Sequence, residues 1–504
     1  MSKVKQEKRN PWFWIPSLYY AQGIPYVVVM TVSVIMYKRL DISNTEIALY
    51  TSWLYLPWVI KPFWSPVVDL LKTKRFWIVT MQLFIGAGLA GVAFTIPVNN
   101  FFQYTLAFFW LLAFSSSTHD IAADGFYMLG LSSHQQAWFV GIRSTFYRLA
   151  MITGQGLLVI IAGYLETQTG NITYSWMITF FILTGLFILF FIYHLFILPS
   201  PKVDKSLLEN ENFNLRRVLA LILGPILLVV LFGTGYFLIS SLLGTLDIID
   251  IWITILSIAI TLFIGILLLR GPVRVWVEKN ESSNIINADL NPLIKFLKVF
   301  IQFLKKDKFW IILSFILLYR LGESQLVKLA SPFLLDPIEI GGLGLSTSEV
   351  GLVYGTIGIT ALTIGGILGG IVIAKQGLKF WLWPMLLAIN LPNFVYVYLS
   401  FTQTTNFLVI NTMVAIEQFG YGFGFTAYML YLIYISGGEQ KTSHYAIATG
   451  FMALGMMIPG MWSGWLQELI GYQNFFVWIC IATIPGFIIA KFVNIDPEFG
   501  KKSE

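Results

Sequence analysis

The sequence predicts an all-α polytopic membrane protein with two six-helix halves and two further helices between them. Three observations support this fold class: an apolar composition, a series of apolar segments long enough to cross a bilayer, and an internal repeat. Of the 504 residues, 57% are hydrophobic and 12% are charged, whereas soluble domains carry about 25% charged residues. A membrane span needs about 20 apolar residues, so the chain has room for a dozen or more spans.

Fourteen apolar segments are expected to form membrane-spanning helices. The first begins at Trp12; it is too long for a signal-peptide core and lacks a small-residue cleavage site, so we expect it to remain as the first helix. An even number of spans places both termini on the same side of the membrane. The segments are 12–37, 46–70, 76–97, 101–131, 135–165, 174–198, 217–240, 247–270, 307–336, 346–374, 379–400, 404–436, 442–468 and 472–492.

The distribution of basic residues predicts that both termini are cytoplasmic. With the N-terminus inside, Lys38 and Arg39 are the only basic residues that fall in an outer loop. The net charge of +6 then reflects topology, and we expect no nucleic-acid partner. The single cysteine, Cys480, excludes an intrachain disulfide and is expected to pack as a small hydrophobic residue.

The internal repeat lies at the start of the second helix of each half. Residues 42–49 (ISNTEIAL) align with residues 345–352 (LSTSEVGL), 303 positions later. Each copy has a candidate N-cap serine followed three residues later by a glutamate, Ser43–Glu46 and Ser346–Glu349, which is the spacing of a capping box. Two such boxes at equivalent positions indicate a duplicated six-helix unit.

The repeat predicts three regions: an N-terminal six-helix half (1–198), a central linker (199–306) and a C-terminal six-helix half (307–504). The linker contains the two extra helices, which we expect to pack against the bundle or against lipid. Its segment 291–306 combines lysines with aromatic residues, which is typical of an amphipathic helix at a membrane surface.

Four charged residues lie within apolar segments of the N-terminal half. Asp120 and Asp124 are four residues apart and share one face of a helix. If the chain turns at residue 133, antiparallel helices bring Asp124 to the depth of Arg143 and Asp120 to the depth of Arg148, so we predict two ion pairs. A charge at the bilayer centre costs roughly 3 kcal/mol on insertion scales unless it is paired or faces water. Such residues predict that the protein moves a solute across the membrane.

The C-terminal half also carries charges at membrane depth. Arg320, Glu323 and Lys328 lie in one apolar segment, and the spacing of Arg320 and Glu323 favours an internal pair. Glu417 lies near the middle of its segment with no charge four residues away. It is either a proton carrier or a hydrogen-bonded structural glutamate.

Four charged residues in and after the second span are candidate gating residues. Lys61 lies two turns inside this span, where it either extends to the membrane surface or faces a cavity. Asp69, Lys74 and Arg75 surround the following loop and could form a cytoplasmic latch. Alternatively, they are ordinary surface charges, since exposed ion pairs contribute little stability.

A series of motifs resembles the AmpG-type muropeptide permeases of the major facilitator superfamily. The motifs are residues 22–25 (QGIP), 61–69 (KPFWSPVVD), 120–124 (DIAAD), 147–149 (YRL), 417–424 (EQFGYGFG), 443–446 (SHYA), 464–468 (GWLQE) and 471–476 (GYQNFF). The resemblance covers both halves and omits 199–306. It implies a proton-driven importer of cell-wall fragments in the bacterial inner membrane, typically of an N-acetylglucosamine–anhydro-N-acetylmuramic acid unit with or without its peptide.

The resemblance also implies a substrate site between the halves near the membrane midplane. Two histidines, His119 and His444, stand where the family usually has glutamine. They are either neutral hydrogen-bonding replacements or groups that tune substrate choice or the response to pH. The expected substrate-binding residues are Gln22, Tyr26, His119, Arg148, Glu323, Gln418, Tyr421 and His444.

Other functions are weighed against this interpretation. The sequence has no G-x-x-x-x-G-K-[ST] phosphate loop, which argues against ATP-driven transport by this chain. The broader family includes acetyl-CoA transporters, so another anionic metabolite or an oligosaccharide remains an alternative substrate. A membrane-embedded glycosyl- or acyltransferase is the alternative from another class. We expect a monomer that binds a small-molecule substrate, protons and lipid, without a cofactor or metal.

Overall fold

The structure is a computed structural model that describes residues 9–201, 204, 230–245, 249–282, 291–438 and 440–501. All regular secondary structure in these ranges is helical, as the sequence predicted. The predicted polar segment that follows residue 204 and the first part of the span 217–240 lie outside the described residues. So does the side chain of Asp69.

The helices of the N-terminal half follow the predicted apolar segments. Two short π-helical segments, Val28–Val32 and Ile152–Leu157, join α1 to α2 and α8 to α9. The helices are α1 (Ile15–Val27), α2 (Ser33–Arg39), α3 (Asn44–Trp53), α4 (Leu56–Val59), α5 (Lys61–Leu71), α6 (Lys74–Thr95), α7 (Phe101–Gly130), α8 (Ser133–Met151), α9 (Leu158–Thr169) and α10 (Ile172–Ile197).

The linker and the C-terminal half provide the remaining helices. The described part of the linker contains the helix Val230–Leu243, α12 (Asp250–Arg270), α13 (Pro272–Ser282) and α14 (Asn291–Leu304). The C-terminal half contains α15 (Phe309–Leu318), α16 (Leu321–Leu335), α17 (Thr347–Val350), α18 (Ile359–Gln376), α19 (Leu378–Asn390), α20 (Phe394–Thr402), α21 (Phe407–Ile435), α22 (Lys441–Ala482) and α23 (Ile484–Ala490). A π-helical segment, Gly351–Gly358, joins α17 to α18.

Within the described ranges, nine helices are long and apolar enough to cross a membrane, so the count of fourteen spans stays a prediction. Several predicted spans are interrupted. The span 46–70 is divided into α3, α4 and α5, and a proline follows the start of each new helix, Pro57 in α4 and Pro62 in α5. Proline is tolerated in the first turn of a helix but disrupts its interior.

The two serine caps have the predicted positions. Ser346 and Glu349 form a complete capping box. Ser43 caps α3 by accepting a hydrogen bond from the backbone N–H of Glu46. The Glu46 carboxylate accepts a hydrogen bond from the Ser43 hydroxyl at 2.8 Å, so the same spacing gives a slightly different cap in this half.

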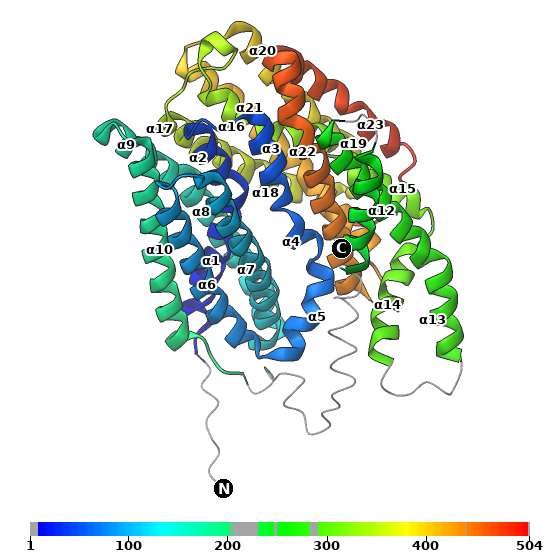
Figure 1. Ribbon diagram of the computed structural model, residues 1–504. Helices are drawn as coiled ribbons and strands as arrows, with labels where there is room; N and C mark the ends of the chain where they lie inside the picture. Colours follow the sequence, from blue (N-terminus) through cyan, green and yellow to red (C-terminus); the bar gives the residue numbers. More distant parts are fainter. Residues whose placement is uncertain are drawn as a thin grey trace.

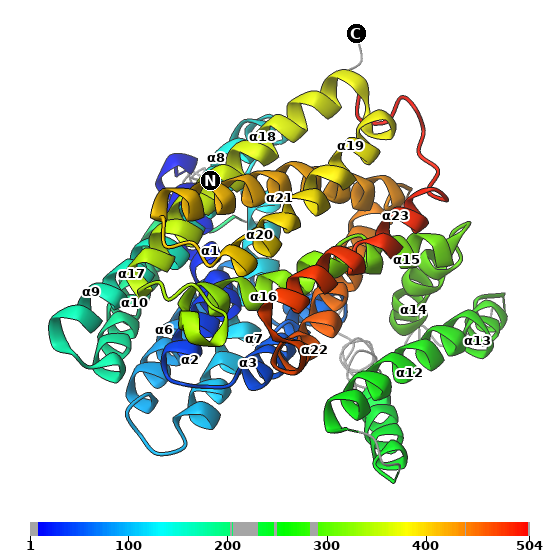
Figure 2. The same cartoon turned by 90° about the horizontal axis from the view of Figure 1, so that it is seen from above.

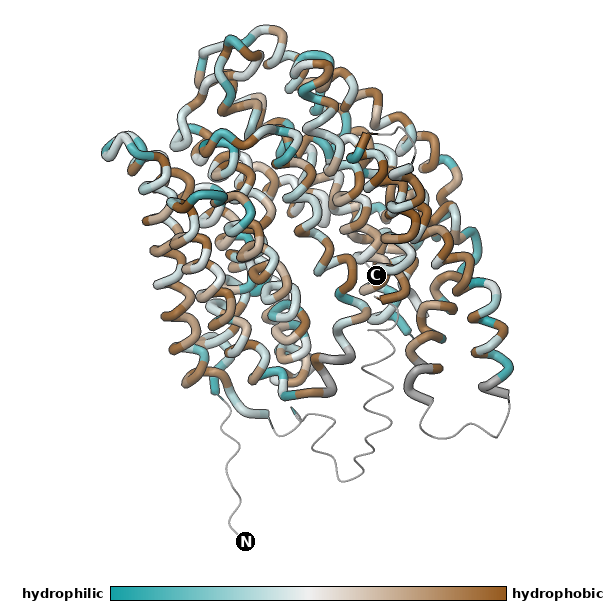
Figure 3. The backbone as a smooth tube through the Cα atoms, in the orientation of Figure 1, coloured by the Kyte–Doolittle hydropathy of each residue, from teal (hydrophilic) through white to brown (hydrophobic). Residues whose placement is uncertain are grey.

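The helices form a bundle in which the two halves lie side by side, with the linker helices on the outside. In Figure 1 the N-terminal helices run from blue to teal on one side, and the green helices α12 to α14 lie at the other. Figure 2 shows α12 and α13 projecting away from the main bundle. Hydrophobic stretches run along the length of outer helices such as α10, and hydrophilic residues gather toward helix ends (Figure 3). This pattern is the one that a surrounding bilayer requires.

The predicted amphipathic helix is present as α14. Its apolar face is buried against the bundle through Ile294, Leu297, Phe300 and Phe303. Phe300 stacks on Phe63 of α5, with 4.8 Å between the ring centroids. The helix therefore contacts the bundle and also joins the linker to the N-terminal half.

Candidate functional site

The inner pair of opposite charges in the N-terminal half has the predicted geometry. The Arg143 guanidinium of α8 lies 2.9 Å from a carboxylate oxygen of Asp124 on α7. The Tyr19 hydroxyl donates to the same oxygen at 3.2 Å. The guanidinium also lies 4.5 Å from the centroid of the Tyr19 ring and 5.0 Å from that of Tyr127. The predicted contact is confirmed, and two tyrosines hold it in place.

The outer pair, Asp120 with Arg148, does not form, and this prediction is wrong. Asp120 instead accepts a hydrogen bond from the Trp58 indole at 3.0 Å. The Lys61 ammonium lies 3.7 Å from the same carboxylate. The break between α4 and α5 brings Lys61 inward, so this lysine faces Asp120. A tryptophan and a lysine of the second span thus occupy the place predicted for Arg148.

Arg148 points away because depth alone does not determine a helical contact. It follows Arg143 by five residues, which rotates its side chain by about 140° around α8. It reaches toward α18 of the other half, where a Cβ on Gly366 would lie 3.1 Å from the Arg148 Nη2 atom. Within the described part of the chain, Arg148 has no hydrogen bond or ion pair.

Two of the predicted substrate-binding residues in α1 lie close to Asp120. The Tyr26 ring packs edge-on against Trp58, with 5.3 Å between centroids. Gln22 is buried beside Asp120, and its carbonyl oxygen has no hydrogen-bond partner among the described residues. The structure therefore brings Gln22, Tyr26 and Asp120 together, with Lys61 and Trp58 added.

The predicted Arg320–Glu323 pair is absent from the C-terminal half. Arg320 lies between α15 and α16 with non-helical backbone angles, φ −114° and ψ 23°, so the i, i+3 geometry of a continuous helix is lost. Its guanidinium donates to the Tyr421 hydroxyl and lies 4.8 Å from the centroid of the Phe425 ring. Both Glu323 carboxylate oxygens are buried without a hydrogen-bond partner in the described ranges.

Glu417 and Gln418 lie together on α21. Both are buried, and the Gln418 amide donates to the Glu417 carboxylate at 2.9 Å. Glu417 is thus at least a hydrogen-bonded residue. Its part in carrying protons stays a prediction.

A buried lysine that received no role in the sequence analysis joins the halves. Lys328 of α16 is 1% exposed, donates to the Thr51 hydroxyl of α3 at 2.8 Å and lies 5.2 Å from the centroid of the Tyr55 ring. The signal in the sequence was a lysine inside an apolar segment. Its partners could not be found that way because they belong to the other half of the chain.

The two histidines occupy different environments, and neither contacts the charges described above. His119 is fully buried and shares a hydrogen bond with Gln82, 3.1 Å away. Gln82 in turn contacts His194 at 3.0 Å, and Ser17 completes this network. The hydrogen bonds of His119 thus lie within the N-terminal half. A direct role in substrate binding stays a prediction.

His444 lies at the start of α22 under the linker helix α14. Its ring packs edge-on against Phe303, with 5.6 Å between centroids. Both ring nitrogens are buried without a hydrogen-bond partner in the described part of the chain. The structure therefore places His444 beside the linker, apart from Gln22 and Tyr26.

Two of the predicted gating residues, Lys74 and Arg75, contact the start of the linker and the end of α10. Asp204 accepts hydrogen bonds from the backbone N–H groups of Lys74 and Arg75 at 2.7 and 3.0 Å. The Arg75 guanidinium donates to the carbonyls of Leu195 and Leu198 at the end of α10. These contacts anchor the start of α6. A gating role for Lys61, Asp69, Lys74 and Arg75 stays a prediction.

The halves contact one another closely at the end opposite the N-terminal residues. Lys38 and Asp336 form an ion pair of 2.7 Å between α2 and the end of α16. Thr347 donates to Glu166 at 2.7 Å, and Thr45 donates to Glu468. Figure 1 shows the ends of α2, α9 and α17 at this end of the bundle.

The two threonine–glutamate contacts, Thr347 with Glu166 and Thr45 with Glu468, are related by an approximate symmetry between the halves. In each case a glutamate near the end of a fifth helix of one half accepts a hydrogen bond from a threonine in the first turn of the second helix of the other half. A glycine precedes each glutamate by one turn. A Cβ on Gly464 would lie 1.9 Å from the Asn44 carbonyl oxygen, so only glycine permits this approach.

Two halves with buried charges on both sides of their interface are the arrangement expected of a solute transporter. The BT1 family is matched over residues 22–307, more than half of the chain. The chain is a member of the BT1 family. Over 486 residues it is 24% identical to a protein named AmpG 4 from Rickettsia conorii, with 94% of each chain covered. It is 28% identical over 188 residues to the anhydromuropeptide permease of Escherichia coli K12, 37% of each chain.

Solved structures show the fold of this BT1 family member. It resembles the nucleoside transporter NupG with a TM-score of 0.59 at 13% identity, covering 95% of this chain and 99% of that one. It resembles the inward open xylose transporter XylE from E. coli with a TM-score of 0.58 at 12% identity, covering 96% of both. The fold is that of the major facilitator superfamily, and the relatives are AmpG-type permeases. The chain is a multi-pass membrane transporter and not an enzyme.

Proposed function

We propose that the protein imports anhydromuropeptides or related amino-sugar cell-wall fragments across the bacterial inner membrane, driven by protons. The name of the E. coli relative, an anhydromuropeptide permease, supports the substrate class, and the motif series that spans both halves agrees with it. The protein acts as a monomer with both termini in the cytoplasm.

The observation that carries the proposal is the set of buried charges with incomplete pairing. Glu323, Arg320 and Lys328 are each at most 6% exposed. Both Glu323 oxygens and the Arg320 Nε atom have no hydrogen-bond partner in the described ranges. Removing such groups from water is costly, and intramembrane charges mark solute and proton pathways. Unpaired carboxylates suit proton binding, because their charge changes without breaking an existing ion pair.

Arg148 is the residue that we assign to the substrate carboxylate. Muropeptides are anionic, and a guanidinium binds a carboxylate through two parallel hydrogen bonds. Arg148 has no partner among the described residues and extends from α8 toward Gly366 in the other half. A ligand held there contacts both halves, as alternating access requires.

In this proposal the closed end faces the periplasm. The ion pair of Lys38 with Asp336 and the two threonine–glutamate contacts hold that end together. Substrate enters after these contacts break and leaves toward the cytoplasm after they form again.

Uptake into proteoliposomes tests the proposal. The substrate is the radiolabelled N-acetylglucosamine–anhydro-N-acetylmuramic acid unit, with and without peptide. We expect accumulation under an inward proton gradient, its loss with a protonophore, and a decrease of at least tenfold for R148Q and E323Q. E339Q, at an exposed glutamate, should retain uptake. If the protein fails to bind this unit but binds acetyl-CoA or an unrelated oligosaccharide, the assignment of the substrate is overturned. Undiminished uptake with a protonophore would overturn proton coupling.

A further inference from the structure

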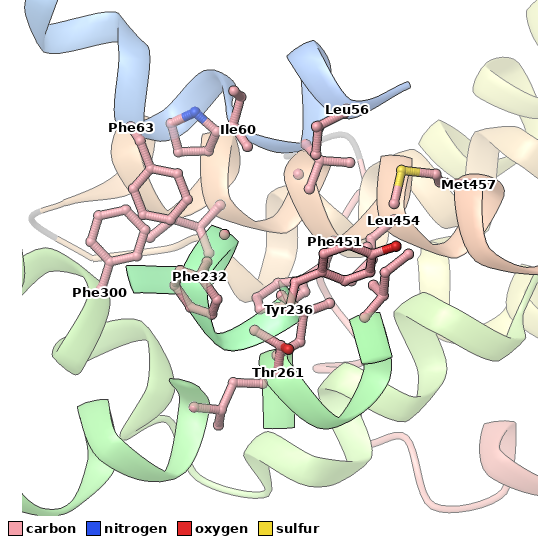
Figure 4. Close-up of a pocket in the computed structure, with 18 of the residues that line it drawn as sticks. Leu56, Ile60, Phe63, Phe232, Tyr236, Thr261, Phe300, Phe451, Leu454 and Met457 are labelled. Carbon is pink, nitrogen blue, oxygen red and sulfur yellow. The ribbon is translucent and has the colours of Figure 1, made fainter. Parts of the chain in front are cut away.

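An apolar cavity lies outside the charged site, where the linker meets both halves. Its volume is about 320 Å³. Helices α3 to α5 of the N-terminal half form one wall, and α22 of the C-terminal half forms another. The linker forms a further wall with the helix Val230–Leu243, α12 and α14. In the close-up of Figure 4, Phe63 and Phe300 lie at one end and Leu454 and Met457 lie toward the other.

The lining excludes a polar solute. Aromatic and aliphatic side chains dominate it, and its lining includes no charged residue from the described ranges. Thr261 is one of the few polar residues, and its hydroxyl is buried without a hydrogen-bond partner in the described ranges. Water in such a cavity would lack the two to four polar partners that it needs. An apolar chain is the chemistry that this lining accepts.

The surroundings of the cavity identify the source of that chain. In the described ranges, its walls come from helices of predicted membrane spans and from the amphipathic helix α14. Arg270 directly follows the lining residue Leu269, and its guanidinium lies 5.3 and 5.6 Å from the ring centroids of Phe309 and Trp310. No carboxylate pairs with Arg270 among the described residues. Basic groups between membrane helices are typical binding sites for anionic lipid headgroups.

We propose that an acyl chain of an anionic membrane phospholipid occupies this cavity, with its headgroup at Arg270. The lipid contacts α5, α22 and the linker at once, and so it joins the three parts of the protein. The two extra linker helices then have a defined role, since they complete the site. The proposal does not depend on which solute the protein transports.

Gly233 offers a way to fill the cavity. It lines the cavity, and a Cβ built on it would have no atom within 4 Å, so G233F adds volume without a backbone clash. Gly185 of α10 is the matched control, because its Cβ would also have open space and it lies outside the cavity. T261L is a second filling variant. R270Q removes the headgroup contact.

The test uses the full chain in nanodiscs that contain phosphatidylglycerol with a photoreactive acyl chain. After irradiation, mass spectrometry should find labelled peptides that contain 53–63, 232–236, 258–269 and 447–457. We expect labelling of these peptides to fall at least fivefold in G233F and T261L and to stay unchanged in G185F. R270Q should abolish the preference for phosphatidylglycerol over phosphatidylcholine. Both filling variants must elute as monodisperse protein. If labelling is then unchanged in both of them, or if α10 is labelled as strongly as the cavity peptides, the proposal is overturned.

Discussion

At the scale of single residues, Lys328 is a buried charge whose one hydrogen bond in the described ranges goes to an uncharged group. It is 1% exposed, and its hydrogen bond goes to a neutral hydroxyl of Thr51. Burying an ion costs several kcal/mol in lost hydration, and one hydrogen bond to a hydroxyl offsets only part of that cost. We expect K328M to raise the midpoint of thermal unfolding in detergent while uptake falls at least tenfold. K375M, at an exposed lysine of α18, should change neither. A K328M protein that is less stable than the parent would show that the amine is needed for folding.

The ion pair of Asp124 with Arg143 leads to a second prediction at this scale. D124N should destabilise the protein by about 1–3 kcal/mol, since it removes a charged hydrogen bond from a guanidinium that is partly buried. The exchange D124R/R143D should recover part of this loss. K501Q, which removes the exposed contact with Glu498, should cost less than about 1 kcal/mol. Thermal unfolding of the four proteins is the measurement. An exchange variant no better than D124N would contradict the pairing argument.

At the scale of helices, interruptions decide where side chains point. Gly471 has φ 74° and ψ 165° inside the long helix α22 and so separates its last two predicted spans. A Cβ there would meet no atom within 4 Å, so the cost of G471A is confined to the backbone. This region of backbone conformation is essentially open only to glycine, so we expect a loss of about 1–3 kcal/mol. G185A, at a helical glycine with equally open space, should be neutral or gain up to about 1 kcal/mol. Equal unfolding midpoints for the two variants would refute the role of the break.

At the scale of the whole molecule, contacts at the closed end should determine which conformation predominates. D336N removes the ion pair with Lys38, and E166Q with E468Q weakens both threonine contacts. The reporter is Y26C in a C480S background, treated from the outside with a membrane-impermeant thiol reagent. We expect this thiol to react faster when D336N, E166Q and E468Q are also present, because the closed state then loses several contacts. E339Q in the same background should leave the rate unchanged. A rate in the triple variant no higher than in the parent would rule out these contacts as the gate.

The sequence by itself determined the properties that depend on neighbouring residues. Apolar segments predicted the helices, because a lipid-embedded backbone must satisfy its hydrogen bonds internally. The two serine caps could be predicted because each depends on residues three positions apart. The contact of Asp124 with Arg143 could be predicted because a short turn brings the two residues to equal depth. The motif series indicated the family that the comparisons then showed.

Only the tertiary structure decided which distant side chains meet. Asp120 contacts Lys61 and Trp58 because α5 begins at a break that turns this lysine inward, whereas Arg148 is rotated away on α8. Arg320 contacts Tyr421 because the chain leaves the helical conformation beside it. Lys328 and Thr51 meet across the two halves, and His444 lies under a linker helix. These contacts depend on helix rotation, on interruptions and on packing between segments hundreds of residues apart, none of which the local pattern of polarity specifies.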